Sequence, residues 1–277
     1  MYRAFFGLRE MPFNLTPDPR YLYLTEQHRE AYDHVMYGIT QRKGFILLVG
    51  EVGSGKTTIC RAILHELGPT TRTALILNPC LNETQLLRAI VGDFGLQPAR
   101  RDRLTLLETL NVFLLEQMRA GTNVALLIDE AQNLSSRLME QVRLLSNLET
   151  AQQKLIQIVL VGQPELNERL SSHELRQLSQ RITVRAHLHR LTQQDLISYI
   201  AHRLLVAGAT PDAVRFDEAA SIAVMAYSDG IPRMVNAVCD NALLAAYVAE
   251  KRVIGADCIQ RAISLLRGET MQKAARP

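Results

Sequence analysis

The sequence has no apolar segment long enough to cross a membrane. No run approaches the roughly 18 uninterrupted apolar residues that a transmembrane helix needs. The longest candidates, FILLV at 45–49 and VALLI at 124–128, have the length of buried strands. The N-terminal stretch MYRAFFGLREMPF also lacks the apolar run of a signal peptide. We therefore expect a cytoplasmic protein, peripheral to the inner membrane only through a partner.

Cysteines are few, and no C-x-x-C pair occurs. This excludes a disulfide scaffold and a thiolate zinc site, so we expect reduced cysteines in the core. His187 and His189 would share one face of a strand, yet no third ligand lies at metal spacing. No H-E-x-x-H motif is present either. The four cysteines are Cys60, Cys80, Cys239 and Cys258.

Low-complexity segments, internal repeats and a strong charge bias are also missing. Glycine and proline number only 15 and 10 of 277 residues, and 47% of the residues are apolar. The net charge of +3 is well short of a chain defined by nucleic-acid or membrane binding. The composition is that of a globular protein.

Short apolar runs recur along the first 190 residues, with helical patterns between them. Most of these runs are apolar on both faces, as strands of a sheet covered on both sides are. The alternation predicts an α/β domain with a mostly parallel sheet. The strand candidates are 44–50, 73–79, 123–129, 156–162 and 182–188.

After about residue 190 the pattern becomes helical. Thr192 and Asp195 form a capping-box pattern, Gly230 follows a second helix, and Pro232 suits the first turn of a third. We expect a small all-helical domain here. The predicted organisation is an N-terminal arm at 1–35, an α/β domain at 36–190, a helical lid at 191–268 and a flexible tail at 269–277.

Residues 50–57, GEVGSGKT, fit the phosphate-binding pattern G-x-x-x-x-G-K-[ST] without a mismatch. The glycines allow backbone N–H groups to point at phosphate oxygens, and the following helix adds its positive end. Lys56 would reach the β- and γ-phosphates of ATP, and the Thr57 hydroxyl would bind Mg²⁺. The predicted nucleotide-binding residues are Gly50, Glu51, Val52, Gly53, Ser54, Gly55, Lys56, Thr57 and Thr58.

A second motif, VALLIDEAQ at 124–132, ends an apolar strand with two carboxylates. Asp129 is suited to hold Mg²⁺. Glu130 would point off the opposite face and deprotonate the attacking water; the alternative is that it only caps the next helix. Gln163 follows the next strand, where it would reach the γ-phosphate or the water, unless it is only a turn residue.

The order of these motifs resembles that of the AAA+ ATPases, and more specifically the ExeA/GspA-like family, which includes the pilus biogenesis ATPase MshM. The motifs that carry the resemblance are FGLREMPFNLTPDPRYLYLTEQHREA, GEVGSGKTTICR, LLIDEAQNL, IVLVGQPEL, LRQLSQRI and DGIPRMVNAVCDNALL, which together cover most of residues 1–268.

The resemblance implies roles for individual residues. It makes Gln163 the first sensor and Arg233 a second sensor, which acts on the phosphates of its own subunit. Arg181 matches the arginine finger, which acts on the nucleotide of a neighbouring subunit; Arg176 is the alternative. Both of these arginines would otherwise be solvated helix-surface charges. The resemblance also places the N-terminal arm near the adenine.

The resemblance further implies an ATPase that self-assembles and supports a bacterial envelope machine, either type II secretion or a type IV pilus, through an inner-membrane partner. Long family members continue into a transmembrane helix and a peptidoglycan-binding domain. Because this chain ends at residue 277, we expect a short MshM-like protein or the cytoplasmic part of a longer one.

Two other functions stay open at this point. The first is a DNA-acting ATPase of the transposition-regulator type, since 168–190 carries five arginines and three histidines and 99–103 reads ARRDR. The second is a nucleotide-gated switch with little turnover, which would not need the intact pair of Asp129 and Glu130.

Overall fold

The computed structural model describes residues 1–16, 18–77, 81–150, 153–210 and 213–268. Contacts divide the chain into two units. The α/β unit contains residues 26–51 and 56–189, and the helical unit contains residues 1–25, residues 52–55 and the chain from Arg190 onward. Cys80 and the predicted tail at 269–277 lie outside the described residues. Within the ranges described, every helix is too short or too polar to span a membrane.

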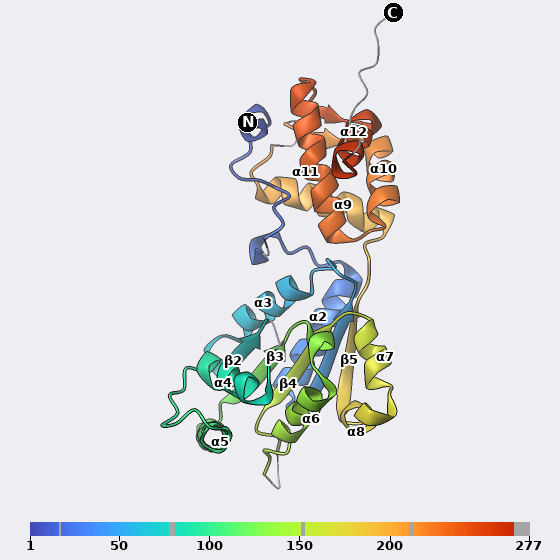
Figure 1. The fold of residues 1–277 in the computed structure, drawn as a ribbon. Coiled ribbons are helices and arrows are strands. Elements are labelled where there is room, and N and C mark those ends of the chain that lie inside the picture. The colour runs from blue at the N-terminus through green and yellow to red at the C-terminus, as the bar shows by residue number, and fades with distance from the viewer. Residues whose placement is uncertain (17, 78–80, 151–152, 211–212, 269–277) are drawn as a thin grey trace, which may run out of the picture. The chain divides into compact units, whose positions relative to one another are not determined.

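The α/β unit is built on a five-stranded parallel sheet (Figure 1). The strand order is β2-β3-β4-β1-β5. Every residue of β1 and β4 is buried, which explains why these segments are apolar on both faces. The predicted parallel sheet is thus confirmed. Its strands are β1 (Phe45–Gly50), β2 (Thr71–Ile76), β3 (Asn123–Ile128), β4 (Gln157–Gly162) and β5 (Ile182–Leu188).

Helices cover both faces of this sheet (Figure 1). On one face α2 (Glu26–Thr40) lies close to β1, because Gly38 lets the backbones approach: a Cβ there would lie 2.6 Å from Cγ1 of Ile46. Leu47, which alternates with Ile46 along the strand, belongs to the core on the other face. That core is covered by α4 (Glu83–Asp93), α5 (Arg103–Arg119) and α6 (Ser136–Leu145). The remaining helices of the unit are α3 (Lys56–Leu67), α7 (Glu165–Leu170) and α8 (Arg176–Ser179).

The strand order determines which polar residues meet at one edge of the sheet. β4 lies between β1 and β3, with Val49 opposite Gly162 and Ile128 opposite Leu160. Because the strands are parallel, the residues that follow their carboxyl ends gather at the same edge. The segments after β1, β3 and β4 therefore converge there.

The helical unit contains α9 (Gln193–Val206), α10 (Glu218–Ser228), α11 (Pro232–Val248) and α12 (Ala256–Leu266). The Thr192–Asp195 capping box and the place of Pro232 in the first turn of α11 are confirmed. Gly230 has a φ of +70°, and a Cβ there would lie 2.2 Å from the carbonyl oxygen of Leu191.

The unit is not all-helical, however. β6 (Arg215–Phe216) and β7 (Val253–Ile254) pair in parallel. Each strand is only two residues long, too short to give a period-2 pattern that the sequence could reveal.

The N-terminal residues also differ from the predicted single arm at 1–35. Residues 26–35 belong to α2, whereas residues 1–25, including α1 (Tyr2–Phe5), join the helical unit. Tyr2, Phe6 and Phe13 are buried in the core of that unit. Burial of these aromatic side chains explains the placement of the segment.

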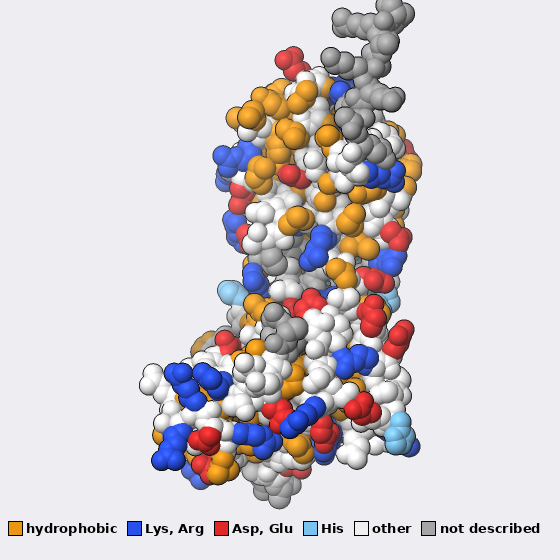
Figure 2. Space-filling model, viewed as in Figure 1, with side chains coloured by type: hydrophobic (Ala, Val, Ile, Leu, Met, Phe, Trp, Pro, Cys, Tyr) orange, Lys and Arg blue, Asp and Glu red, His pale blue; other side chains and the backbone are white. Residues whose placement is uncertain are grey.

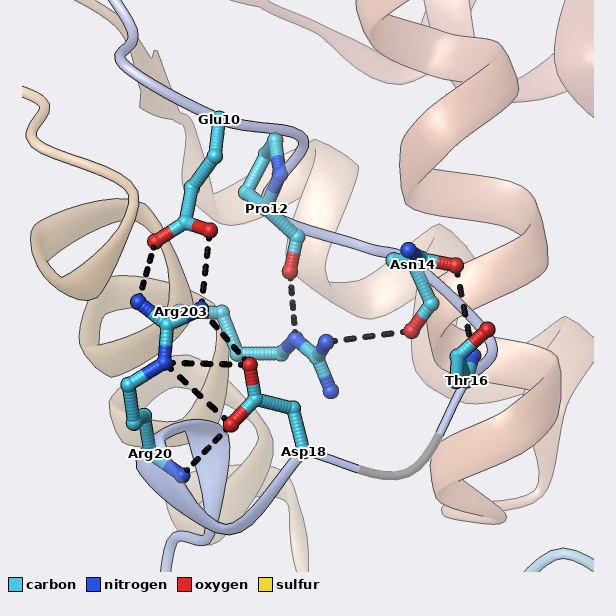
Figure 3. A network of polar contacts seen from close by, with 7 residues as sticks. All are labelled: Glu10, Pro12, Asn14, Thr16, Asp18, Arg20 and Arg203. Carbon is cyan, nitrogen blue, oxygen red and sulfur yellow. Dashed lines mark hydrogen bonds and ion pairs between the residues drawn. The ribbon is translucent and has the colours of Figure 1, made fainter.

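A polar network ties this segment to α9 (Figure 3). Arg203 is buried, and its guanidinium donates to the carbonyl oxygens of Pro12 at 2.6 Å and Asn14 at 3.2 Å. Arg20 in turn forms ion pairs with Glu10 and Asp18. A buried guanidinium needs hydrogen-bond acceptors, and here the backbone carbonyls supply them. The N-terminal segment is therefore held against α9.

Candidate nucleotide site

The lysine of the phosphate-binding motif is buried at the start of α3. Lys56 is 5% exposed, and its ammonium donates to the carbonyl oxygens of Gly50 at 2.8 Å and Glu51 at 2.9 Å. A buried ammonium needs such partners because burial removes its hydration. The loop that precedes α3 thus holds a cation.

The tip of the loop, residues 52–55, groups with the helical unit. Gly53 has a φ of +81° and Gly55 a φ of +101°, a region that side chains rarely adopt. A Cβ on Gly53 would lie 2.6 Å from Cβ of Arg233, whose backbone N–H donates to the Gly53 carbonyl at 3.2 Å. The buried Oγ of Ser54 has no hydrogen-bond partner among the described residues.

These features fit a phosphate ligand. The positive φ values bend the loop backbone in the way that a nest of N–H groups requires. The orphaned Ser54 hydroxyl has a donor to offer, and Lys56 supplies the positive charge.

Next to the loop, a hydroxyl and a carboxylate meet. The Thr57 hydroxyl donates to Oδ2 of Asp129 at 2.6 Å. Asp129 is 2% exposed, and its backbone N–H donates to the Ile76 carbonyl at 2.8 Å. Hydroxyl and carboxylate oxygens are hard ligands, and Mg²⁺ characteristically takes one or two from the protein and the rest from phosphates and water. The donor set therefore fits Mg²⁺.

Glu130 adopts a left-handed conformation with φ of 53°, which is uncommon for a residue with a side chain. Its carboxylate makes no capping hydrogen bond to the following 3₁₀ turn η3 (Ala131–Asn133), so the capping interpretation is wrong. Instead it accepts from the side-chain amides of Gln132 at 2.5 Å and Gln163 at 3.4 Å. The structure thus brings Gln163 to Glu130.

Gln132 is a site residue that the sequence interpretation missed. Its Oε1 accepts the backbone N–H of Gln163 at 3.2 Å, and a Cβ on Gly162 would lie 2.8 Å from the same atom. The guanidinium of Arg169, on α7, donates to the carbonyl oxygens of Gln132 and Leu134. Gln132 therefore links the turn after β3 to the end of β4. The only feature of the sequence that could have indicated this role is the position of Gln132, two residues after Glu130.

The two candidate finger arginines have different surroundings. Arg181 is partly buried and donates to Oγ of Ser146 at 2.7 Å and to Oδ1 of Asn147 at 2.6 Å. These residues follow the C-terminal end of α6, where a cation is favoured. Arg176 is exposed on α8, and no partner for its guanidinium is found in the described part of the chain.

The basic segment 168–190 does not present its charges as one patch. Charges of both signs are interspersed on the face of the α/β unit that Figure 2 shows. Arg169 and Arg181 donate to the groups named above, Arg185 donates to Oγ of Ser179 at 3.2 Å, and Arg190 forms an ion pair with Asp229. Four of its five arginines therefore have partners within the chain.

Two further groups near the motifs carry shifted pKa values. Burial, with a smaller contribution from Asp129, raises the pKa of the Cys60 thiol well above its usual value, so this cysteine stays a neutral thiol. Burial and the neighbouring His189 lower the pKa of His187. The rings of His187 and His189 stack with centroids 4.4 Å apart. Among the described residues, no group of three or more His, Cys, Asp or Glu could hold a metal ion.

Comparison with known proteins gives matches over most of the chain. The model of the AAA domain family matches residues 39–170. General secretion pathway protein A from Aeromonas hydrophila is 47% identical over 248 residues, which is 89% of this chain and 45% of that protein. The chain thus spans less than half the length of this relative.

Solved structures share the fold at low sequence identity. The Aeropyrum pernix ORC2 protein in its ADPNP-ADP complexes is 17% identical, with a TM-score of 0.68 over 92% of this chain and 71% of that one. Cdc6p from Pyrobaculum aerophilum is 17% identical, with a TM-score of 0.64 over 91% and 68%. The Thermotoga maritima RuvB branch migration motor is 18% identical, with a TM-score of 0.60 over 92% and 76%. At such identities the likeness shows the fold alone.

Proposed function

The chain belongs to the ExeA/GspA-like family of AAA+ ATPases, and on this premise we propose that it binds ATP with Mg²⁺ and hydrolyses the terminal phosphate bond. The observation that carries the proposal is the arrangement at one edge of the sheet. There Thr57 meets Asp129, and the Glu130 carboxylate is held by two glutamine amides instead of capping a helix. This is the set of groups that metal-assisted phosphoryl transfer to water requires.

In the proposed complex, the backbone N–H groups of residues 50–58 and the Lys56 ammonium hold the phosphates. Thr57 and Asp129 hold Mg²⁺, which when bound neutralises charge on the phosphate oxygens. Arg233 adds a second cation from the helical unit. Its backbone N–H donates to the Gly53 carbonyl, and this supports the role because it keeps residue 233 beside the tip of the loop.

Glu130 is the proposed general base. It accepts the proton of the attacking water, and Gln163 orients that water or the γ-phosphate. The two glutamine amides that hold the Glu130 carboxylate support this role, because they fix the position of the base. Gln132 keeps the carboxylate in place between the two strand ends.

The test is Glu130→Gln. The amide keeps the size of the side chain but cannot accept the proton, so turnover is expected to fall by about 10²–10⁴-fold while ATP affinity stays within a few-fold. Glu116→Gln, an exposed glutamate on α5, serves as the control and should retain wild-type kcat. Undiminished hydrolysis by Glu130→Gln would remove Glu130 as the base.

The cellular role that the family supports is assembly of a secretion or pilus machine at the bacterial envelope. The matched relative is named for the general secretion pathway. We place this chain in the cytoplasm, acting on an inner-membrane partner. In the source bacterium, loss of the gene should impair secretion or piliation, and the wild-type gene should restore it where Glu130→Gln does not. Normal secretion and piliation after deletion would reject this role.

Self-assembly is part of the proposal. In GTPases an arginine finger raises the rate of hydrolysis about 10³–10⁵-fold. If a neighbouring copy provides the finger here, a lone subunit should hydrolyse ATP slowly. We assign the finger to Arg181, with Arg176 as the alternative.

A further inference from the structure

The turn that carries Gln132 leaves two of its own backbone carbonyls open. Within the turn, the N–H of Asn133 donates to the Glu130 carbonyl at 2.9 Å, and the N–H of Leu134 donates to the Ala131 carbonyl at 3.1 Å. The carbonyl oxygens of Gln132 and Leu134 accept no backbone hydrogen bond from the described residues. A donor from elsewhere in the chain must satisfy them, or water must.

Arg169, on α7, provides that donor. Its Nη1 donates to the carbonyl oxygen of Gln132, and its Nη2 donates to that of Leu134 at 2.7 Å. In the described part of the chain no carboxylate forms an ion pair with this guanidinium, so its charge strengthens the two bonds to the turn. Because the fork of a guanidinium is planar and rigid, it fixes the two carbonyls relative to each other.

The helix that carries Arg169 is itself held at the end of β4. Leu166 and Leu170 are buried in the core of the α/β unit. Gly162, the last residue of β4, makes room for Leu166, since a Cβ there would lie 2.7 Å from Cδ2 of that side chain. Arg169 thus fastens the turn after β3 to a helix that is anchored on the neighbouring strand.

We propose that Arg169 is a positioning residue for the hydrolysis proposed above, on which this inference rests. By holding the carbonyl of Gln132, it fixes the backbone from which the Gln132 side chain reaches both Glu130 and the backbone N–H of Gln163. None of its hydrogen bonds within the described ranges goes to the phosphate loop or to Glu130. Arg169 therefore acts on the rate through Gln132.

Loss of the guanidinium should impair the chemical step and not nucleotide binding. Without it the peptide group after Gln132 is free to turn, and the amide that holds the Glu130 carboxylate moves with it. A displacement of about 1 Å costs up to about 10²-fold in rate. The contact between Thr57 and Asp129 does not depend on this turn, so binding of ATP should be kept.

Steady-state ATPase kinetics of the full chain tests the proposal with Arg169→Ala. We expect kcat to fall by about 10–100-fold, while the KM for ATP stays within a few-fold. Arg42→Ala is the matched control and should keep the wild-type kcat. Arg42 is also partly buried and donates to the side chain of Gln153 and to the carbonyl of Gly121, but it precedes β1 and so lies at the opposite edge of the sheet.

A double variant tests whether the effect runs through Gln132. If it does, Arg169→Ala should lower kcat no further in a Gln132→Ala background, because residues that act as one unit give non-additive changes. A merely structural role of Arg169 would give losses that multiply. Multiplied losses, or an unchanged kcat in Arg169→Ala, would overturn the proposal.

Arg169→Lys replaces the alanine variant if circular dichroism shows that Arg169→Ala does not fold. The single ammonium of lysine cannot bridge the two carbonyls as a guanidinium does. We expect a smaller loss of kcat in the same direction, with the same non-additivity toward Gln132→Ala.

Glu130→Gln in the same assay separates this inference from the proposed function. If Glu130→Gln hydrolyses ATP at the wild-type rate, the proposed function fails and this inference fails with it. If Glu130→Gln is impaired while Arg169→Ala keeps the wild-type kcat, only the role of Arg169 fails.

Discussion

The side-chain amide of Gln132 donates to the carboxylate of Glu130 across 2.5 Å. The Oε1 atom of the same side chain accepts a hydrogen bond from the backbone N–H of Gln163. One residue thereby holds both the proposed base and the strand end that carries the proposed sensor. Gln132 is a positioning residue, since it acts on the reaction through Glu130 and Gln163.

Gln132→Ala is expected to lower kcat for ATP hydrolysis by about 10²-fold, because a misplaced catalytic group loses about that much. The KM for ATP should change little, since the phosphate loop is intact. Steady-state kinetics over a range of ATP concentrations separates the two parameters. Gln177→Ala, an exposed residue on α8, is the control. A raised KM with unchanged kcat would show that Gln132 serves binding instead.

Arg181→Ala should abolish the rise in specific ATPase activity with protein concentration, if Arg181 is the finger. The same change removes the hydrogen bonds to Ser146 and Asn147, so we also expect a loss of stability of about 1–3 kcal/mol. Arg176→Ala removes an exposed side chain and should leave stability unchanged. Activity and melting temperature measured across a dilution series distinguish the two arginines. Loss of activation in Arg176→Ala alone would transfer the role to Arg176.

Replacing two glycines of the α/β unit by alanine should change the free energy of unfolding in opposite directions. At Gly38 the new Cβ would lie 2.6 Å from the Ile46 side chain, so Gly38→Ala should destabilise by about 1–3 kcal/mol through overpacking. At Gly92, on α4, it would meet no heavy atom within 4 Å, so Gly92→Ala should stabilise by about 0.4–1 kcal/mol. Urea denaturation measures both. Equal effects at the two positions would contradict the packing of α2 on β1.

The fold was largely predictable because its signals are local. Apolar runs such as 45–49 predict buried strands, and all five predicted strands are present. Thr192 with Asp195 and Pro232 mark helix starts through hydrogen bonds and φ values within one turn. The short strands β6 and β7 were not predicted, because two residues are too few to show the alternation of apolar and polar side chains that marks a strand.

The site was predictable only in part. Thr57 and Asp129 were expected to share a metal, and their 2.6 Å contact places them together. The hydrogen bond from the backbone N–H of Gln163 to Gln132 joins residues that follow two different strands, β4 and β3, and no spacing in the sequence encodes it. The same holds for Arg181, whose partners lie more than thirty positions away.

By itself the sequence determined the parallel sheet and the loop conformation demanded by Gly53 and Gly55, because both depend on the chemistry of neighbouring residues. Only the tertiary structure decided that β4 lies between β1 and β3, that Gln132 holds Glu130, and that residues 1–25 complete the helical core. Those outcomes depend on packing between segments distant in the chain, where burial and hydrogen-bond satisfaction of the whole fold select one arrangement among many.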